Sequence, residues 1–154
     1  MSQTAATKLE RDEIDSFLHQ QPAGTLSLAK DGDTYAVPVA FTVVDGSRDI
    51  YFRLGYGPGS RKREYVDATD RATFVVAART DSGWKSVVAR GPLEHLSSAD
   101  NVDSTQPSGP ESPPVSHADI ERQIPFYSVF DSPSEMTFAL VRLRTDELTG
   151  VVEQ

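Results

Sequence analysis

The stretch that decides the fold is Ile50-Tyr-Phe-Arg-Leu-Gly-Tyr-Gly-Pro-Gly-Ser-Arg-Lys-Arg63. Residues 50–54 alternate, with Ile50, Phe52 and Leu54 on one face, which predicts a strand. Residues 55–59 form a glycine-rich loop, and residues 60–68 are typical of a short helix. The segment therefore predicts a strand that leads through a glycine loop into the N-terminus of a helix.

The charge on this segment is unusual for the chain. Residues 61–63 are the one run of three basic residues in a protein of net charge −8. Cations at a helix N-terminus cost roughly a few tenths of a kcal/mol each, and a bound anion would reverse that sign. Backbone N–H groups, the Ser60 hydroxyl and the side chains of Arg61 and Lys62 could converge on a phosphate. The alternative is a solvated basic turn that pairs with Glu64, Asp67 or Asp70.

The rest of the chain reads mainly as strands joined by tight turns. Asp31-Gly32 and Asp45-Gly46 are hairpin signals. Pro38 lies inside a strand, which favours an edge, a bulge or an opening in the sheet. Such a series favours an antiparallel barrel or sandwich. The expected strands are 25–29, 34–44, 50–54, 72–79, 84–96 and 137–143, and a helix is expected within 9–20.

The length of 154 residues predicts one domain. We expect a flexible N-terminal tail over 1–8 and a single domain over 9–154. Within it, residues 97–116 are rich in proline and serine, which predicts a mobile loop. A short helix is expected at 117–124, followed by an aromatic patch at 125–130.

Composition excludes several classes of function. The chain has no cysteine, and its three histidines are far apart and outside any metal-binding motif, so we expect no metal site. The acidic charge argues against a nucleic-acid partner. No apolar leader or membrane-length apolar run is present, so we expect a cytoplasmic protein with no membrane partner. An acidic surface with few lysines suits a salt-rich cytoplasm, and an ordinary acidic protein fits equally well.

The strand, the glycine loop and Gly59-Ser60-Arg61-Lys62 resemble the FMN-phosphate segment of the pyridoxamine 5'-phosphate oxidase family. The resemblance implies a mainly β fold, a six-stranded antiparallel split β-barrel with a few short helices. In that family the Arg-Lys pair holds the flavin phosphate, a role that falls here to Arg61 and Lys62, with Ser60 as a helper. The preceding family strand touches the phosphate and ribityl chain, which implies contacts from Phe52 and Arg53.

Two further segments carry the same resemblance. Residues 36–41 resemble the family strand whose backbone follows the isoalloxazine edge, which implies contacts from Val37, Pro38 and Val39. Lys85 and Ser86 stand where the family has an Arg-Gln pair, of which the glutamine touches FMN from the partner subunit. The resemblance therefore implies a homodimer with flavin sites at its interface.

The resemblance implies an FMN-dependent oxidoreductase, in which FMN supplies the hydride chemistry. Its substrate and electron donor stay open, because the chain end lacks the tryptophan and proline with which the oxidase holds its vitamin B6 substrate. Arg53, Tyr56, Lys85 and Tyr127 are candidates for lining the pocket. One alternative is a non-catalytic module that binds flavin, deazaflavin or haem for storage or sensing. Another is a flavin-free structural barrel.

Overall fold

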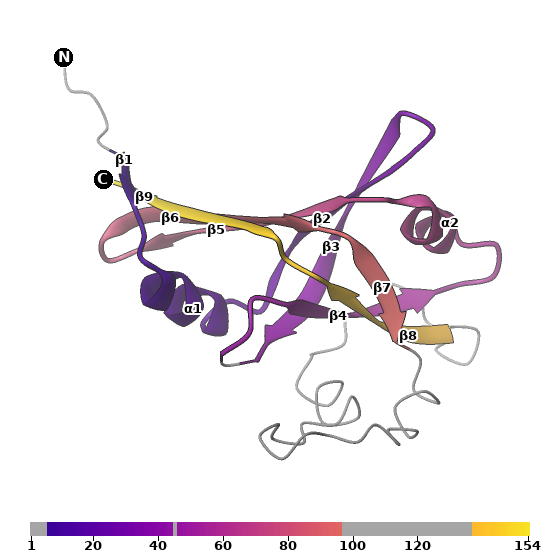
Figure 1. Ribbon diagram of the computed structural model, residues 1–154, viewed down its shortest axis with the longest axis horizontal. Helices are drawn as coiled ribbons and strands as arrows, with labels where there is room; N and C mark the ends of the chain where they lie inside the picture. Colours follow the sequence, from indigo (N-terminus) through magenta and orange to yellow (C-terminus); the bar gives the residue numbers. More distant parts are fainter. Residues whose placement is uncertain (1–5, 45, 97–136) are drawn as a thin grey trace.

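The computed structural model describes residues 6–44, 46–96 and 137–154. Over these residues the chain forms one antiparallel sheet of nine strands in the order β1-β9-β6-β5-β2-β3-β4-β8-β7, with two helices (Figure 1). The strands are β1 (Ala6–Lys8), β2 (Ala23–Lys30), β3 (Asp33–Val43), β4 (Ile50–Tyr56), β5 (Ala72–Thr80), β6 (Gly83–Gly91), β7 (Leu93–Leu96), β8 (Thr137–Leu143) and β9 (Glu147–Glu153), and the helices are α1 (Arg11–His19) and α2 (Arg61–Ala68).

The expected split barrel is confirmed, with more strands than the six predicted. The expected strand 84–96 is divided into β6 and β7 at Pro92, which has no N–H to donate to a ladder. The segment that pairs with it is divided in the same way into β8 and β9. Two bent segments of the chain therefore form four of the nine strands. At the bend, the Arg144 N–H donates to the Pro92 carbonyl (2.9 Å) and the Asp146 N–H to the Arg90 carbonyl (2.9 Å). The sequence did not predict β9 or β1.

Strand β3 is where the barrel opens. It pairs with β2 through residues 33–40, but with β4 only through residues 41–43. Among the described strands none pairs with the second edge of β3 over residues 33–40. The opening lies along the strand that contains Pro38, which agrees with the expectation from that proline.

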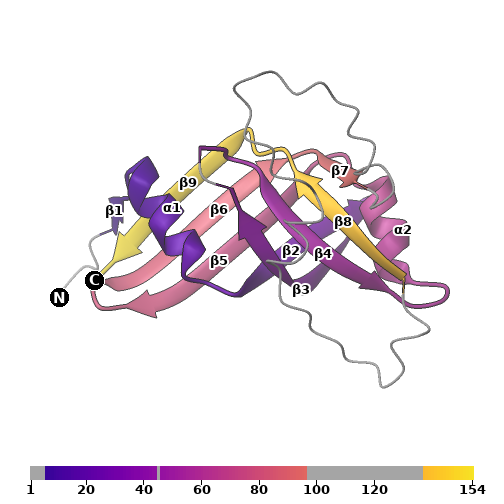
Figure 2. The same ribbon diagram turned by 90° about the horizontal axis from the view of Figure 1, so that it is seen from below.

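The core lies between the two parts of the folded sheet. Phe74 packs edge-on against Phe41 and Phe52, with ring centroids 5.0 and 4.9 Å apart. Its ring is 1% exposed. Helix α1 covers one end of this core, where Leu9 and Ile14 pack against Gly150 of β9. Figure 2 shows α1 lying across β9, β6 and β5, with α2 at the opposite end of the molecule.

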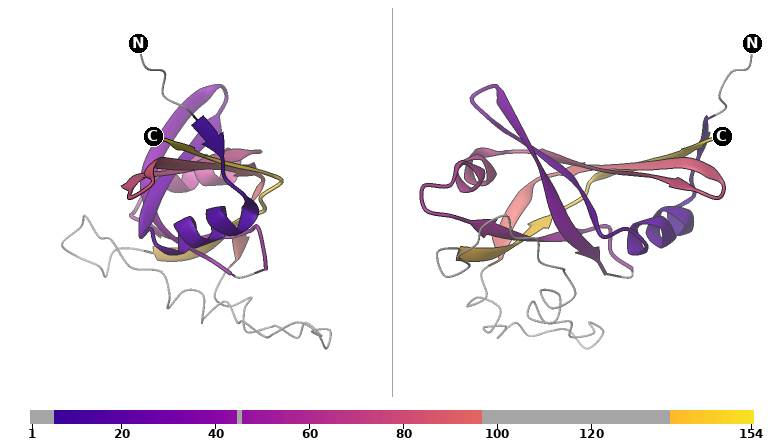
Figure 3. Two further views of the ribbon diagram at one scale, coloured as in Figure 1. Left: turned by 90° about the vertical axis from the view of Figure 1, so that its left-hand side faces the viewer. Right: turned by 180° about the vertical axis from the view of Figure 1, so that it is seen from behind.

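Local signals account well for the first helix and the first hairpin. Helix α1 begins after Glu10, whose N–H donates to the Glu13 carboxylate (2.9 Å) as in a capping box. Asp31 and Gly32 take φ angles of 51° and 81°, as a two-residue turn with two left-handed positions requires. The β2–β3 hairpin that they close projects from the body of the fold (Figure 3).

Some expectations fall on the ends of the described ranges or beyond them. The N-terminal tail was expected to reach residue 8, whereas Ala6–Lys8 pair with β9 in the structure. The loop at 97–116, the helix at 117–124, the aromatic patch and Tyr127 lie outside the described residues. Neither of the two described helices is long and apolar enough to cross a membrane.

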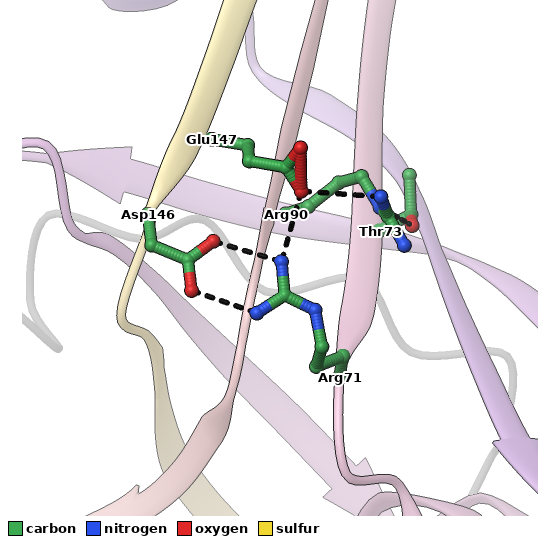
Figure 4. A network of polar contacts seen from close by, with 5 residues as sticks. All are labelled: Arg71, Thr73, Arg90, Asp146 and Glu147. Carbon is green, nitrogen blue, oxygen red and sulfur yellow. Dashed lines mark hydrogen bonds and ion pairs between the residues drawn. The ribbon is translucent and has the colours of Figure 1, made fainter.

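An ion-pair network ties β5, β6 and β9 together near the bend (Figure 4). Arg71 donates to both oxygens of Asp146 (2.7 and 2.8 Å) and to Glu147 (2.9 Å). Arg90 donates to the same Glu147 carboxylate (3.1 Å) and to the Thr73 hydroxyl (3.3 Å). Arg71 holds the pKa of Asp146 below its ordinary value through these hydrogen bonds.

Candidate functional site

Ser60 is the N-cap of α2, at the end of the glycine loop. Its hydroxyl accepts a hydrogen bond from the Arg63 N–H (3.2 Å). The N–H groups of Arg61 and Lys62 belong to the first turn, where a helix supplies no acceptor of its own. Gly59 has a φ of 64°, a left-handed conformation that glycine adopts without strain. The chain therefore presents backbone donors at this end, as the sequence predicted.

The three basic side chains of this turn diverge. Lys62 turns back toward β4, and its ammonium donates to the Gly55 carbonyl (3.1 Å). Burial lowers the pKa of Lys62, so its charge is held in a poorly solvated position. Arg61 is exposed. Arg63 lies over the ring of Tyr56, with its guanidinium carbon 5.7 Å from the ring centroid.

A groove of about 590 Å³ opens beside this turn. It runs between the glycine loop and one face of α2, so both backbone donors and charged side chains line it. Its lining residues are Tyr56, Gly57, Pro58, Gly59, Ser60, Arg63, Glu64 and Asp67. Tyr56 thus lines a groove as expected, whereas Arg61 and Lys62 are not among the lining residues.

A cluster of four side chains stands at the side of the groove. The Tyr56 hydroxyl and His95 Nε2 are 3.1 Å apart and hydrogen-bonded, and His95 Nδ1 lies 3.4 Å from an Asp67 carboxylate oxygen. The second Asp67 oxygen is 4.0 Å from Arg63 Nε. Burial, with the nearby Asp67 charge, raises the pKa of Tyr56, which keeps the phenol neutral. The cluster joins β4, α2 and β7.

Helix α2 is fixed to the β2–β3 hairpin. The buried Thr69 hydroxyl accepts from the Ala29 N–H (3.0 Å) at the C-terminal end of the helix. The Tyr65 hydroxyl donates to Asp33 (2.6 Å), and Glu64 forms an ion pair with Lys30. These contacts place the start of α2 relative to the open edge of β3.

The candidate residues on β3 lie along that open edge. Val37 and Val39 point into the core, while Pro38 is exposed. Their side chains are therefore not ligands held in a pocket, and the groups they offer are those of the backbone edge. Tyr35, two residues before Val37, packs on Tyr65 of α2 with ring centroids 5.3 Å apart, which brings this strand close to the helix.

The structure does not bring Phe52 and Arg53 to the groove. Phe52 is fully buried in the aromatic core, so its side chain is a packing residue rather than a contact of a bound ligand. Arg53 points to the opposite side of β4, with its guanidinium carbon 5.0 Å from the centre of the Phe138 ring. Because successive side chains of a strand point to opposite faces of the sheet, Phe52 and Arg53 lie on different faces.

Lys85 and Ser86 are remote from α2 within one chain. Lys85 pairs with Ala78 of β5. Ala78 is six residues from Ala72, where β5 begins after α2, and six residues of strand span about 20 Å. Consecutive residues of a strand point to opposite faces, so Lys85 and Ser86 do not act on one side of the sheet. A single chain therefore does not assemble all of the candidate residues.

Sequence reasoning did not assign roles to Arg63, Asp67 and His95. Arg63 belonged to the basic run, and Asp67 was considered as its partner in a solvated turn. His95 carried no local signal, because its contact with Tyr56 spans 39 positions. Among the described residues, no group of three or more histidine, cysteine or acidic side chains is arranged to hold a metal ion.

Comparison with known proteins adds to this geometry. A family model described as pyridoxamine 5'-phosphate oxidase matches residues 10–152. Among curated proteins, none matches the sequence significantly. The family match covers most of the chain, including both helices and the segment of residues 50–63 with which the sequence analysis began.

Solved structures match the fold over nearly its whole length. An FAD-binding protein from Mesorhizobium loti has a TM-score of 0.67 at 20% identity, with 99% of each chain covered. A conserved protein of unknown function from Corynebacterium diphtheriae has a TM-score of 0.64 at 19% identity, covering 96% of this chain and 97% of that one. An FAD-binding protein from Mycobacterium smegmatis has a TM-score of 0.60 at 16% identity, covering 96% and 99%. At these identities the likeness is one of fold.

Proposed function

The chain belongs to the pyridoxamine 5'-phosphate oxidase family, and from that premise we propose that it is a flavoprotein that binds FMN at the start of α2. The observation that carries the proposal is the cationic, donor-rich helix start beside a groove. Ser60, Arg61 and Lys62 begin α2, and the groove of about 590 Å³ is lined by the loop that precedes them. A bound anion would offset the cost of placing three cations at the positive end of a helix dipole.

The residues present fit a phosphate monoester. The N–H groups of Arg61 and Lys62 and the side chain of Arg63 supply donors at the helix start, as phosphate sites require. The Lys62 ammonium, poorly solvated against the Gly55 carbonyl, adds positive charge at the end of β4. The open edge of β3 near Val37 and Val39 supplies backbone N–H and C=O groups for the ring system.

We propose a flavin-dependent oxidoreductase as the activity. FMN, when bound, supplies hydride transfer, and the protein holds and orients it. A flavin carrier or sensor is the second candidate, since relatives of this fold are named for the FAD they bind. Reduction of the bound flavin by NAD(P)H supports the enzyme, whereas a bound flavin that no donor reduces supports the carrier.

We also propose that two copies meet through the outer face of the sheet. Helix α1 and strands β4 and β8 lie on one side of β9, β6 and β5 (Figure 1). Phe74, Val76, Val87 and Ala89 are buried, so by alternation their neighbours in β5 and β6 point to the other side. Two successive rows of outward residues across the three strands carry no charge. The two rows are Val75, Val88 and Thr149, and Ala77, Ser86 and Val151. An uncharged patch of β-branched and small residues is suited to a self-complementary interface. A second copy would bring its own Ser86 near a site that one chain leaves incomplete.

Titration of the flavin-free protein with FMN, followed by flavin absorption and fluorescence, tests the cofactor. We expect saturation near one FMN per chain, and Arg61→Ala with Lys62→Ala should lose several kcal/mol of binding in total, at roughly 1.5–3 for each charged hydrogen bond. Arg11→Ala, an exposed arginine on α1 at the opposite end of the fold from α2, is the matched control. A parallel titration with FAD shows whether the protein prefers FMN or FAD. A titration with riboflavin, which lacks the phosphate, measures the contribution of that group. Unchanged affinity in the double variant refutes the site.

The dimer is tested separately. Val88→Arg places a charge at the centre of the outer face, and sedimentation at several protein concentrations reports the mass. A dimer that becomes a folded monomer supports the interface, and a dimer that Val88→Arg leaves intact refutes it.

A further inference from the structure

In the polar cluster beside the groove, His95 and Arg63 both face the carboxylate of Asp67. Asp67 lines the groove, and its two oxygens face His95 Nδ1 at 3.4 Å and Arg63 Nε at 4.0 Å. Arg63 also lines the groove, whereas His95 is not among the lining residues. Any change in how His95 holds Asp67 is therefore transmitted to two side chains that a ligand in the groove would meet.

The hydrogen bond to Tyr56 fixes the orientation of the His95 ring. A carboxylate only accepts, so the neutral ring is favoured with its proton on Nδ1, toward Asp67. Nε2 then holds the lone pair and accepts the proton of the Tyr56 hydroxyl at 3.1 Å. Because Tyr56 is 3% exposed, the His95 ring is hydrogen-bonded to a buried partner.

We infer that His95 is a positioning residue that controls anion binding in the groove through Asp67 and Arg63. While His95 is neutral, the Asp67 charge faces the groove and attracts Arg63. When His95 is protonated, it pairs with Asp67 as a full ion pair, which cancels that negative charge and releases Arg63 to a phosphate. Protonation of His95 therefore raises the affinity of the groove for an anion.

Among the residues that the structure describes, few charged or titratable groups lie around His95. Helix α2 contributes Asp67 and Arg63, and β4 contributes Tyr56. On β7 itself, Glu94 is engaged by Arg142 and Arg144 and is turned to β8. The carboxylate that pairs with His95 is therefore Asp67, and replacing that residue isolates the interaction.

The first experiment compares FMN binding by the full chain and by His95→Gln from about pH 5.5 to pH 8. The phosphate monoester itself titrates near pH 6, so the quantity of interest is the ratio of the two dissociation constants at each pH. We expect the wild type to gain roughly two- to fivefold over the variant at the acid end, the size of an exposed ion pair. Riboflavin, which has no phosphate, should show a constant ratio. His19→Gln, on α1 at the other end of the fold, is the matched control.

This inference rests on the proposed flavin site for its ligand, and a second experiment separates the two. NMR of the His95 imidazole in the ligand-free protein reports the protonation and tautomer of the ring. Inorganic phosphate is the probe of the groove, and its binding is followed by the amide chemical shifts of Gly57 and Gly59. We expect the Nδ1–H tautomer, and phosphate-induced amide shifts that strengthen at low pH in the wild type but not in Asp67→Asn.

The outcomes are distinguishable. Absence of FMN binding with intact pH-dependent phosphate binding removes the flavin proposal and leaves the role of His95 standing. Phosphate shifts that strengthen at low pH equally in the wild type and in Asp67→Asn, or a pH-independent ratio for both FMN and phosphate, overturn the inference whatever the flavin result.

Discussion

Gly91 is the residue on which the bend of the barrel depends most directly. A methyl group added there would lie 2.0 Å from the Arg144 carbonyl oxygen and 2.9 Å from its carbon. Carbon and oxygen normally approach no closer than roughly 3.3 Å. Both atoms belong to backbone, so the Gly91→Ala variant must move one chain by more than about 1 Å rather than rotate a side chain.

The loss of stability in Gly91→Ala can be estimated from the contacts between the two backbone segments at the bend. Overpacking typically costs about 1–3 kcal/mol, and the two hydrogen bonds that flank Gly91, at Pro92 and Arg90, place this site near the upper end. The loss of chain entropy in the unfolded state offsets about 0.4–1 kcal/mol. We therefore expect a net destabilisation of about 2 kcal/mol, which lowers Tm by roughly 4–8 °C for a chain of this size.

Thermal and urea unfolding of the flavin-free protein, followed by far-UV circular dichroism, measures the change. Ser16→Ala, on the exposed face of α1, is the control and should stay within about 0.5 kcal/mol of the wild type. A Gly91→Ala protein as stable as the wild type would show that the two chains do not cross as closely as described.

Three further predictions concern stability. Phe74→Ala removes the ring on which Phe41 and Phe52 pack and should lower the free energy of unfolding by about 3–5 kcal/mol in urea titrations. An unchanged free energy of unfolding would show that the core does not depend on this aromatic cluster. Thr69→Val leaves the Ala29 N–H without its acceptor and should cost about 1–3 kcal/mol, with Thr69→Ser close to the wild type; equal loss in both variants would contradict the hydrogen-bond argument. The lowered pKa of Asp146 means that its contribution is present above its ordinary pKa and is lost as the pH falls through the lowered value. Asp146→Asn should therefore show a shallower loss of unfolding midpoint between about pH 5 and pH 2, and parallel profiles would refute the role of this carboxylate.

The features predicted from the sequence are those encoded by neighbouring residues. The turn at Asp31-Gly32, the start of α1 after Glu10 and the N-cap at Ser60 each follow from side chains within a few positions. The fold class follows from such signals taken in order, together with the family resemblance.

The features missed depend on contacts between distant residues. Strand β9 is one of them, because it is held by its pairing with β6 and by Ile14 of α1, which packs against Gly150. In the site, chain order placed Arg61 and Lys62 together but could not show that Lys62 turns to the Gly55 carbonyl. Nor could it bring His95 to Asp67, since β7 meets α2 only in the folded barrel.

The pairing of β8 and β9 with strands much earlier in the chain has a consequence for synthesis. Residues 137–153 supply the partners of β4, β6 and β7, so these three strands leave the ribosome before the segment that pairs with them. Until then the edges of β4 and β6 are open to strands of other chains, as in any sheet with unpaired edges. Slow translation or C-terminal truncation before residue 147 should therefore increase aggregation of nascent chains and their dependence on chaperones.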